Sequence, residues 1–131
     1  MNLLNKKCKA CEDKKLKPFS KEEAQDYLDF APGWFLSDPS TALGASALKI
    51  HKEFLFKDFV QAIRFINRVA DIAEMEGHHP DIYVFYNKVN LELWTHAIGG
   101  PSTGAATTGG LSENDFILAA KIDDMLSLLG K

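Results

Sequence analysis

Residues 74 to 96 read EMEGHHPDIYVFYNKVNLELWTH and hold three of the four histidines of the chain. Apolar residues alternate with other residues on both sides of residues 87 and 88, a pattern typical of a β-hairpin with a two-residue turn. In that register His79 opposes His96 across the hairpin, with Cβ atoms roughly 5 Å apart. His78 is the next residue along the chain, so the sequence predicts a cluster of three imidazoles.

The two faces of this hairpin differ because side chains alternate along a strand. The apolar face is expected to cover the core, and its residues are Ile82, Val84, Tyr86, Val89, Leu91 and Leu93. The other face carries His79 and His96 with Tyr83, Phe85 and Trp94. These aromatic side chains can frame a flat heterocycle or pack against another element, and the pattern leaves both interpretations open.

Composition places the chain among ordinary globular proteins. It has 131 residues, 46% of them hydrophobic and 25% charged, which is enough for a single domain with one core. The net charge of -3 argues against a nucleic-acid-binding protein. No apolar run is long enough to span a bilayer and the first residues do not resemble a signal peptide, so we expect a cytoplasmic protein.

Cys8 and Cys11 form a single Cys-x-x-Cys within residues 1–17, a lysine-rich segment that we expect to be a flexible tail. A structural zinc site needs four ligands and usually a second such pair, which this sequence lacks. A reduced, solvated tail and a metal or redox site both stay open for this motif.

Three helices are predicted from the residues at their ends. The first follows Ser20, which can form a capping box with Glu23. The second begins at Asp58 and ends at Gly77, and the third begins after Ser112. In the second helix, apolar residues recur at helical spacing. This spacing predicts that the helix packs through Phe59, Ile63, Ile66, Ala70 and Ala73.

Further strands are expected at residues 34–36 and 48–56. Lys52, on the apolar side of the second of these, indicates an edge strand, able to pair with a second copy of the chain. Glycine, serine and threonine at residues 101–110 predict a flexible loop. The order of elements predicts an α+β fold over residues 18–131, with one four-stranded antiparallel sheet and three helices packed on one face.

The histidines are the strongest candidates for chemistry, because imidazole exchanges protons near neutral pH. Around one pocket they suit elimination of water, with one group protonating a leaving hydroxyl and another acting as base. A structural pair and a zinc site of three imidazoles are the alternatives, although adjacent residues on a strand point to opposite sides.

Glu74-x-x-x-His78-His79-Pro80, followed by Tyr86 and His96, resembles the signature of the pterin-4a-carbinolamine dehydratases. The likeness extends over about residues 18–127. Further segments resemble this family in order and approximate spacing, namely Gly33-Trp34 and residues 54–59, 86–89 and 111–115. Relative to the family, about ten residues near 101–110 look inserted.

This resemblance implies removal of water from 4a-hydroxytetrahydropterin, the product of aromatic amino acid hydroxylases, without a metal or organic cofactor. His78 and His96 would be the acid/base pair, and His79 would position the pterin. The residues expected to bind the substrate are Glu74, Trp94, Thr95 and Asp115. The resemblance also implies homodimers or homotetramers. Some relatives bind transcription factors through a helical surface, so a non-catalytic binding module is the alternative.

Overall fold

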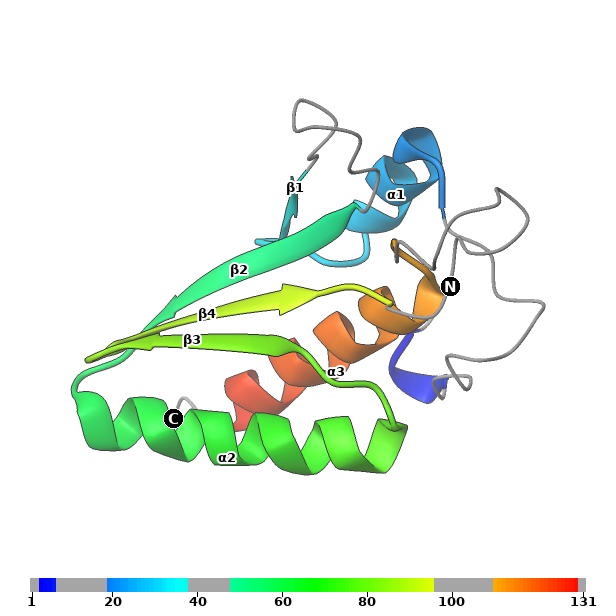
Figure 1. The fold of residues 1–131 in the computed structure, drawn as a ribbon. Coiled ribbons are helices and arrows are strands. Elements are labelled where there is room, and N and C mark those ends of the chain that lie inside the picture. Colours follow the sequence, from blue (N-terminus) through cyan, green and yellow to red (C-terminus); the bar gives the residue numbers. More distant parts are fainter. Residues whose placement is uncertain (1–2, 7–18, 38–47, 96–109, 130–131) are drawn as a thin grey trace.

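The structure, a computed structural model, describes residues 3–6, 19–37, 48–95 and 110–129 (Figure 1). Its elements are η1 (Leu3–Asn5), α1 (Lys21–Leu28), β1 (Phe35–Ser37), β2 (Lys49–Leu55), α2 (Phe59–Glu76), β3 (Asp81–Phe85), β4 (Lys88–Leu93) and α3 (Glu113–Leu129). The strands form one antiparallel sheet in the order β1-β2-β4-β3. Figure 1 shows α2 and α3 against the same side of this sheet, which confirms the predicted α+β architecture.

The helix ends form where local side chains satisfy free backbone groups. Ser20 Oγ accepts the N–H of Glu23 at 3.1 Å, and Glu23 Oε1 accepts the N–H of Ser20 at 2.9 Å, so the predicted capping box is present. Asp58 Oδ1 accepts the N–H of Gln61 at 2.9 Å and begins α2. Such caps each stabilise a helix by about 1 kcal/mol.

None of the described helices is long and apolar enough to cross a membrane.

The core lies between the covered face of the sheet and the helices. Its buried residues include Ile50, Phe54, Val89, Leu91 and Leu93 from the strands and Phe65, Val69, Phe116 and Ile122 from the helices. Lys52 shares this face of β2, and its Nζ lies 3.0 Å from Asp123 Oδ1 on α3. The ion pair compensates the charge at the rim of the core.

The predicted packing side of α2 is only partly right, because Ala73 is buried and Ile66 packs half-buried against the core, whereas Phe59 and Ala70 are exposed. The buried positions are Ala62, Phe65, Val69, Ala73 and Glu76, so only Ala73 belongs to both sets. Phe59 is 49% exposed. Both sets recur at helical spacing, so periodicity does not distinguish them. The rotation of α2 instead follows Phe65, whose ring centroid lies 4.7 Å from that of Phe54 and 5.0 Å from that of Phe56.

β2 was predicted to be an edge strand, and this prediction is wrong for residues 49–51, which have a partner strand on each side or on the outer side. β1 pairs with residues 49–51 on one side, and β4 pairs with residues 50–55 on the other. From Lys52 to Leu55 β4 is the one strand partner in the described part of the chain. The other edge of the sheet is β3, which pairs with β4 alone among the described strands.

The hairpin turn lies one residue earlier than predicted. Phe85 pairs with Lys88, so the turn is Tyr86-Asn87, with Tyr86 at a φ of 54°. The N–H of Phe56 donates to the carbonyl of Asn87 at 2.8 Å, and Asn87 Nδ2 donates to the carbonyl of Phe56 at 3.0 Å. These two bonds hold the turn against the end of β2, and they offset the absence of the glycine that such turns favour.

The shifted turn changes the register of the whole hairpin. Each residue of β3 pairs two positions earlier on β4 than predicted, for example Ile82 with Leu91 instead of Leu93, so the predicted register is wrong. His96, which was predicted to oppose His79, lies outside the described residues. The register moves by an even number of positions, so each strand residue keeps its predicted face. Val89, Leu91 and Leu93 on β4 are buried as predicted. Ile82 and Val84, predicted to cover the core, are 37% and 38% exposed on the outer strand β3, and Tyr86 is in the exposed turn.

The N-terminal segment differs from the predicted tail at residues 3–6. Leu3 in η1 is buried in the core cluster, and Lys6 Nζ lies 2.9 Å from Glu113 Oε2 of α3. The rest of that segment, with Cys8 and Cys11, lies outside the described residues, as do residues 101–109 of the predicted loop.

Candidate active site

A left-handed turn at the end of α2 directs His78 into the protein. Gly77 has a φ of 65° and a ψ of 27°, a conformation that glycine adopts without a Cβ clash. The N–H of His78 donates to the carbonyl of Ala73 at 3.1 Å, and that of Gly77 to the carbonyl of Glu74 at 3.3 Å. These are the two bonds of a Schellman motif, as expected for glycine at this position. The His78 side chain is only 2% exposed.

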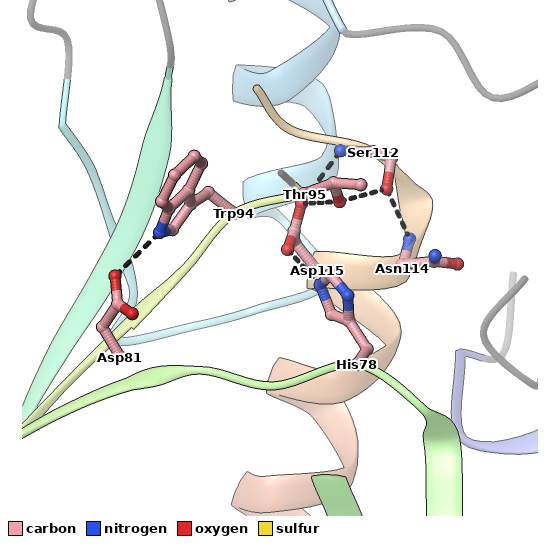
Figure 2. Close-up of polar contacts among 7 residues, drawn as sticks. All are labelled: His78, Asp81, Trp94, Thr95, Ser112, Asn114 and Asp115. Atoms are coloured by element: carbon pink, nitrogen blue, oxygen red, sulfur yellow. Dashed lines mark hydrogen bonds and ion pairs between the residues drawn. The ribbon is translucent and has the colours of Figure 1, made fainter. Parts of the chain in front are cut away.

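Asp115, in the first turn of α3, meets His78 inside the protein. Figure 2 shows the imidazole directed at the carboxylate, with His78 Nε2 2.6 Å from Asp115 Oδ1. The second oxygen, Oδ2, accepts the hydroxyl of Thr95 and the N–H of Ser112, both at 3.0 Å. The Asp115 side chain has no exposed surface. Three donors therefore satisfy a buried carboxylate, which is the condition under which a charge is tolerated there.

Thr95 and Ser112 complete the network behind this pair. Thr95 Oγ1 lies 2.8 Å from Ser112 Oγ, which also accepts the N–H of Asn114 at 3.3 Å. The backbone of Thr95 forms a bridge with Gly110, with nitrogen-to-oxygen distances of 2.7 and 3.1 Å. Thr95 was expected to bind the substrate, and the structure places it fully buried against Asp115.

Two members of this arrangement were not predicted as site residues. Ser112 was predicted only as a helix cap, although the Ser-x-x-Asp spacing is the signal that brings the Asp115 carboxylate back to its N–H. Gly110 has no such signal, because its bridge to Thr95 joins residues on either side of a long connection.

The contact with Asp115 favours one tautomer of the His78 ring. An ionised carboxylate only accepts hydrogen bonds, so the hydrogen shared with Asp115 sits on Nε2. A buried carboxylate that sets the tautomer and orientation of a histidine is a recurrent arrangement in general acid/base catalysis.

His79 and Glu74 form a second pair on the surface. His79 Nε2 lies 2.5 Å from Glu74 Oε2, with side chains 59% and 77% exposed. His78 and His79 thus have separate partners, as expected for successive side chains of an extended segment. Among the described residues, no three His, Cys, Asp or Glu side chains are grouped so that they could hold a metal ion.

Trp94 lies on the face of the sheet that the helices leave open. Its Nε1 donates to Asp81 Oδ2 at 2.8 Å, and Lys49 Nζ lies 4.7 Å from the ring centroid. Figure 2 shows the indole directed to Asp81, apart from the buried network. Nearby, the Tyr83 hydroxyl donates to Glu92 at 3.2 Å, and the negative charge of Glu92 raises the pKa of Tyr83.

The structure therefore divides the predicted site residues into groups. His78, Thr95 and Asp115 come together in one buried network. Glu74 and His79 form the surface pair, and Trp94 lies on the open face. His96 lies outside the described residues.

The family model described as pterin 4 alpha carbinolamine dehydratase matches residues 17–125 of this chain. The chain belongs to this family. Pterin-4-alpha-carbinolamine dehydratases are hydro-lyases, and the matched span includes every residue of the buried network and of the surface pair.

Two sequences illustrate how similar this dehydratase chain is to its relatives. A protein of Arabidopsis thaliana, named pterin-4-alpha-carbinolamine dehydratase 2, mitochondrial, is 44% identical over 125 residues. That alignment covers 95% of this chain and 59% of the plant protein, so the chain spans little more than half of that relative. A protein of Nitrosospira multiformis, which carries the same enzyme name in provisional form, is 43% identical, with 97% of this chain and 95% of the relative covered.

A solved structure shares the dehydratase fold. The crystal structure described as transcriptional coactivator/pterin dehydratase from Brucella melitensis superposes with a TM-score of 0.63 at 29% identity. The match covers 83% of this chain and 98% of the Brucella chain.

Proposed function

We propose that this chain removes water from 4a-hydroxytetrahydropterin and releases quinonoid dihydropterin, a step in pterin recycling. The main support is the buried 2.6 Å bond between His78 Nε2 and Asp115 Oδ1, within the span that matches the family. That bond holds an imidazole, the side chain best suited to proton transfer near neutral pH, in one orientation.

The reaction requires two proton movements. A carbinolamine carries a hydroxyl group and an amine nitrogen on the same carbon, so loss of water breaks the C–O bond and leaves a C=N bond. An acid protonates the departing hydroxyl, and a base takes the proton from the nitrogen. No oxidation state changes in either movement, so side chains that carry protons suffice and no cofactor is required.

In this proposal His78 transfers a proton, and Asp115 is a positioning residue. His96 is the second proton-transfer group, by its place in the family signature. His79, exposed beside Glu74, holds the pterin ring, and its exposure supports this role because a ligand can reach it from solvent. Trp94, with its indole on the open face, is the flat surface proposed for the substrate.

A direct assay of water loss from synthetic 4a-hydroxypterin tests the proposal. His78→Ala and His96→Ala should each lower kcat by roughly a hundredfold or more, the range for a positioned proton-transfer group. Lys88→Gln, an exposed change on β4, is the control and should keep the wild-type rate. Exhaustive chelation should leave the rate unchanged. Loss of activity on chelation, with recovery on adding zinc, would replace the proposal with a metal mechanism.

Assembly into dimers or tetramers is the second part of the proposal. The strand predicted for pairing, β2, has β4 as its one described partner over residues 52–55. The outer strand β3 also has one described partner strand, and its Ile82 and Val84 side chains are 37% and 38% exposed. Phe59 and Val60 on α2 are exposed as well. Such surfaces favour pairing between copies of the chain. Sedimentation at micromolar concentration should show an oligomer, and a monomer would contradict this part.

Protein binding is a second candidate function, because the Brucella relative is described as a transcriptional coactivator as well as a pterin dehydratase. A chain with intact fold and no dehydratase activity in the assay would favour this candidate. An aromatic amino acid hydroxylase is the proposed source of the substrate and the cytoplasm the proposed compartment, although the Arabidopsis relative is named mitochondrial. Cell fractionation tests the compartment.

A further inference from the structure

A hollow beside residues 61–68 of α2 is lined by both arginines of the chain. Arg64 and Arg68 are its only arginines, and they lie one helical turn apart. The hollow has a volume of about 610 Å³. Its lining combines residues of α2 with Phe56 after β2 and Leu126 of α3. Along α2 the arginines lie roughly 15 to 20 Å before His78 at the rise of an α-helix, so the hollow is separate from the candidate active site.

The inner wall of the hollow is apolar and aromatic. Phe65 is buried, whereas Phe56 and Leu126 are half-buried and present part of their surface to the hollow. The ring centroids of Phe56 and Phe65 lie 5.0 Å apart. Cavities of this size that are lined by aromatic side chains and a few polar groups are typical sites for small organic ligands. This wall suits a flat apolar body.

The charges at the rim favour an anion. Arg64 and Arg68 are both exposed, and within the part of the chain that the structure describes neither guanidinium has an ion pair or hydrogen bond. The lysines at positions 6, 49, 52 and 121 are, in contrast, each paired with a carboxylate. Like charges one turn apart on a helix repel each other. An anion between the two arginines would offset that repulsion.

Because the two cations are arginines and not lysines, they favour particular kinds of anion. Its planar guanidinium forms two parallel hydrogen bonds with a carboxylate or phosphate, which the point charge of lysine does not. Gln61, whose side chain also lines the hollow, adds an amide that can donate to the same group. We infer that this hollow binds a small aromatic anion, with its ring against Phe56 and Phe65 and its carboxylate or phosphate between Arg64 and Arg68.

Amide chemical shifts of the full, isotope-labelled chain test this inference. Phenyl phosphate and benzoate are titrated separately, with inorganic phosphate and phenol as the two halves of the first probe. At least one aromatic anion should produce saturable shifts at residues 61–68 and at Leu126. Its Kd should be at least about tenfold lower than that of either half, because the two linked groups bind together. The aromatic anion with the lower Kd shows whether the hollow prefers a phosphate or a carboxylate group.

Variants distinguish binding in this hollow from binding elsewhere on the chain. Arg64→Gln combined with Arg68→Gln should raise the Kd at least tenfold, and Arg68→Lys should weaken binding less. Lys88→Gln removes a positive charge on β4, and His78→Ala removes the candidate active site, so both should bind as the wild type does. Circular dichroism and the Tm establish that each variant is folded.

Three results would overturn the inference. The first is the absence of saturable shifts, or equal binding by the double arginine variant. The second is a set of shifts centred on His78 and His79, which would place the probe in the candidate active site. The third is a changed sedimentation coefficient of the double variant without any probe, which would make the hollow an interface between copies of the chain.

Discussion

Asp115 accepts the Nε2–H of His78 at 2.6 Å, and this bond joins the second residue after α2 to the first turn of α3. The same two helices are tied by an ion pair between Glu76 Oε2 and Lys121 Nζ, also at 2.6 Å. The orientation of the His78 ring therefore depends on how α2 and α3 pack together. A change at either helix is expected to reach the candidate active site through this contact.

Asp115→Asn should lower both stability and activity. The carboxylate accepts from three donors, and an amide has one accepting oxygen, so at least one buried donor loses its partner. We expect the free energy of unfolding to fall by about 1 to 3 kcal/mol in urea titrations. The kcat should fall by roughly tenfold or more, since the tautomer of His78 is no longer fixed. The ring nitrogen shifts of His78 report that tautomer directly.

Asp124→Asn is the matched control for this variant, because Asp124 is an exposed residue of α3. It should leave kcat and the ring shifts of His78 unchanged. An Asp115→Asn protein with wild-type kcat and wild-type ring shifts would contradict the positioning role.

Glu74→Gln separates catalytic from structural roles of the surface pair. Exposed ion pairs contribute at most about 1 kcal/mol to stability, so the Tm should change little. If His79 holds the pterin, loss of its carboxylate partner should raise KM by roughly tenfold, or about 1.4 kcal/mol of binding energy. Glu22→Gln on the exposed side of α1 is the control. An unchanged KM and kcat would remove Glu74 from the proposed site.

Gly77→Ala should destabilise the protein by about 1 kcal/mol or more through backbone strain alone. Nothing lies within 4 Å of the Cβ that alanine would add, so no steric clash contributes. Gly77→Asn should lose less, because asparagine tolerates the left-handed conformation better. Urea unfolding of the wild type, Gly77→Ala and Gly77→Asn gives the order of their stabilities. Equal stability of the alanine variant and the wild type would show that this turn relaxes to another conformation.

Tyr27 should make stability depend on alkaline pH. Burial, together with the hydrogen bond from its hydroxyl to Glu113 at 2.9 Å, raises the pKa of Tyr27 from 10.0 to about 12. Between these values the unfolded chain loses the phenolic proton while the folded protein keeps it, so stability falls as pH rises through this window. The stability difference between wild type and Tyr27→Phe should therefore narrow from pH 10 to pH 12. A constant difference across that range would be inconsistent with the raised pKa.

Deletion of residues 101–109 tests whether the long connection before α3 takes part in the reaction. Gly110 is kept because it pairs with Thr95 at the base of this connection. Shortening the connection about threefold should stabilise the fold by roughly 1 kcal/mol. We expect a slightly higher Tm with unchanged kcat and KM. A large fall in either constant, with normal circular dichroism, would show that the connection contributes to the active site.

The helix ends and the order of elements could be read from the sequence alone. Ser20, Asp58 and Gly77 act on backbone groups within a few residues of themselves, so their effect does not depend on the rest of the fold. Alternation along the strands identified Val89, Leu91 and Leu93 as core residues for a similar reason. A family signature then pointed to His78, His79 and Asp115.

Tertiary contacts decided the rotation of α2, the register of the hairpin and the partner of His78. α2 has two apolar stripes of equal spacing, and only the packing of Phe65 against Phe54 and Phe56 selects one. The turn is set by Asn87, whose backbone and side chain bond to Phe56, 31 residues earlier. Periodicity describes neighbours within one element, and these contacts join residues from different elements.

The buried bond between His78 and Asp115 joins residues 37 positions apart. The sequence by itself determined that a histidine follows the glycine at the end of α2 and that an aspartate lies in the first turn of α3. Only the folded chain decided that the two side chains meet, because α2 and α3 must first pack on the same face of the sheet. That packing excludes water from both groups, and a buried carboxylate then requires the three donors that surround it.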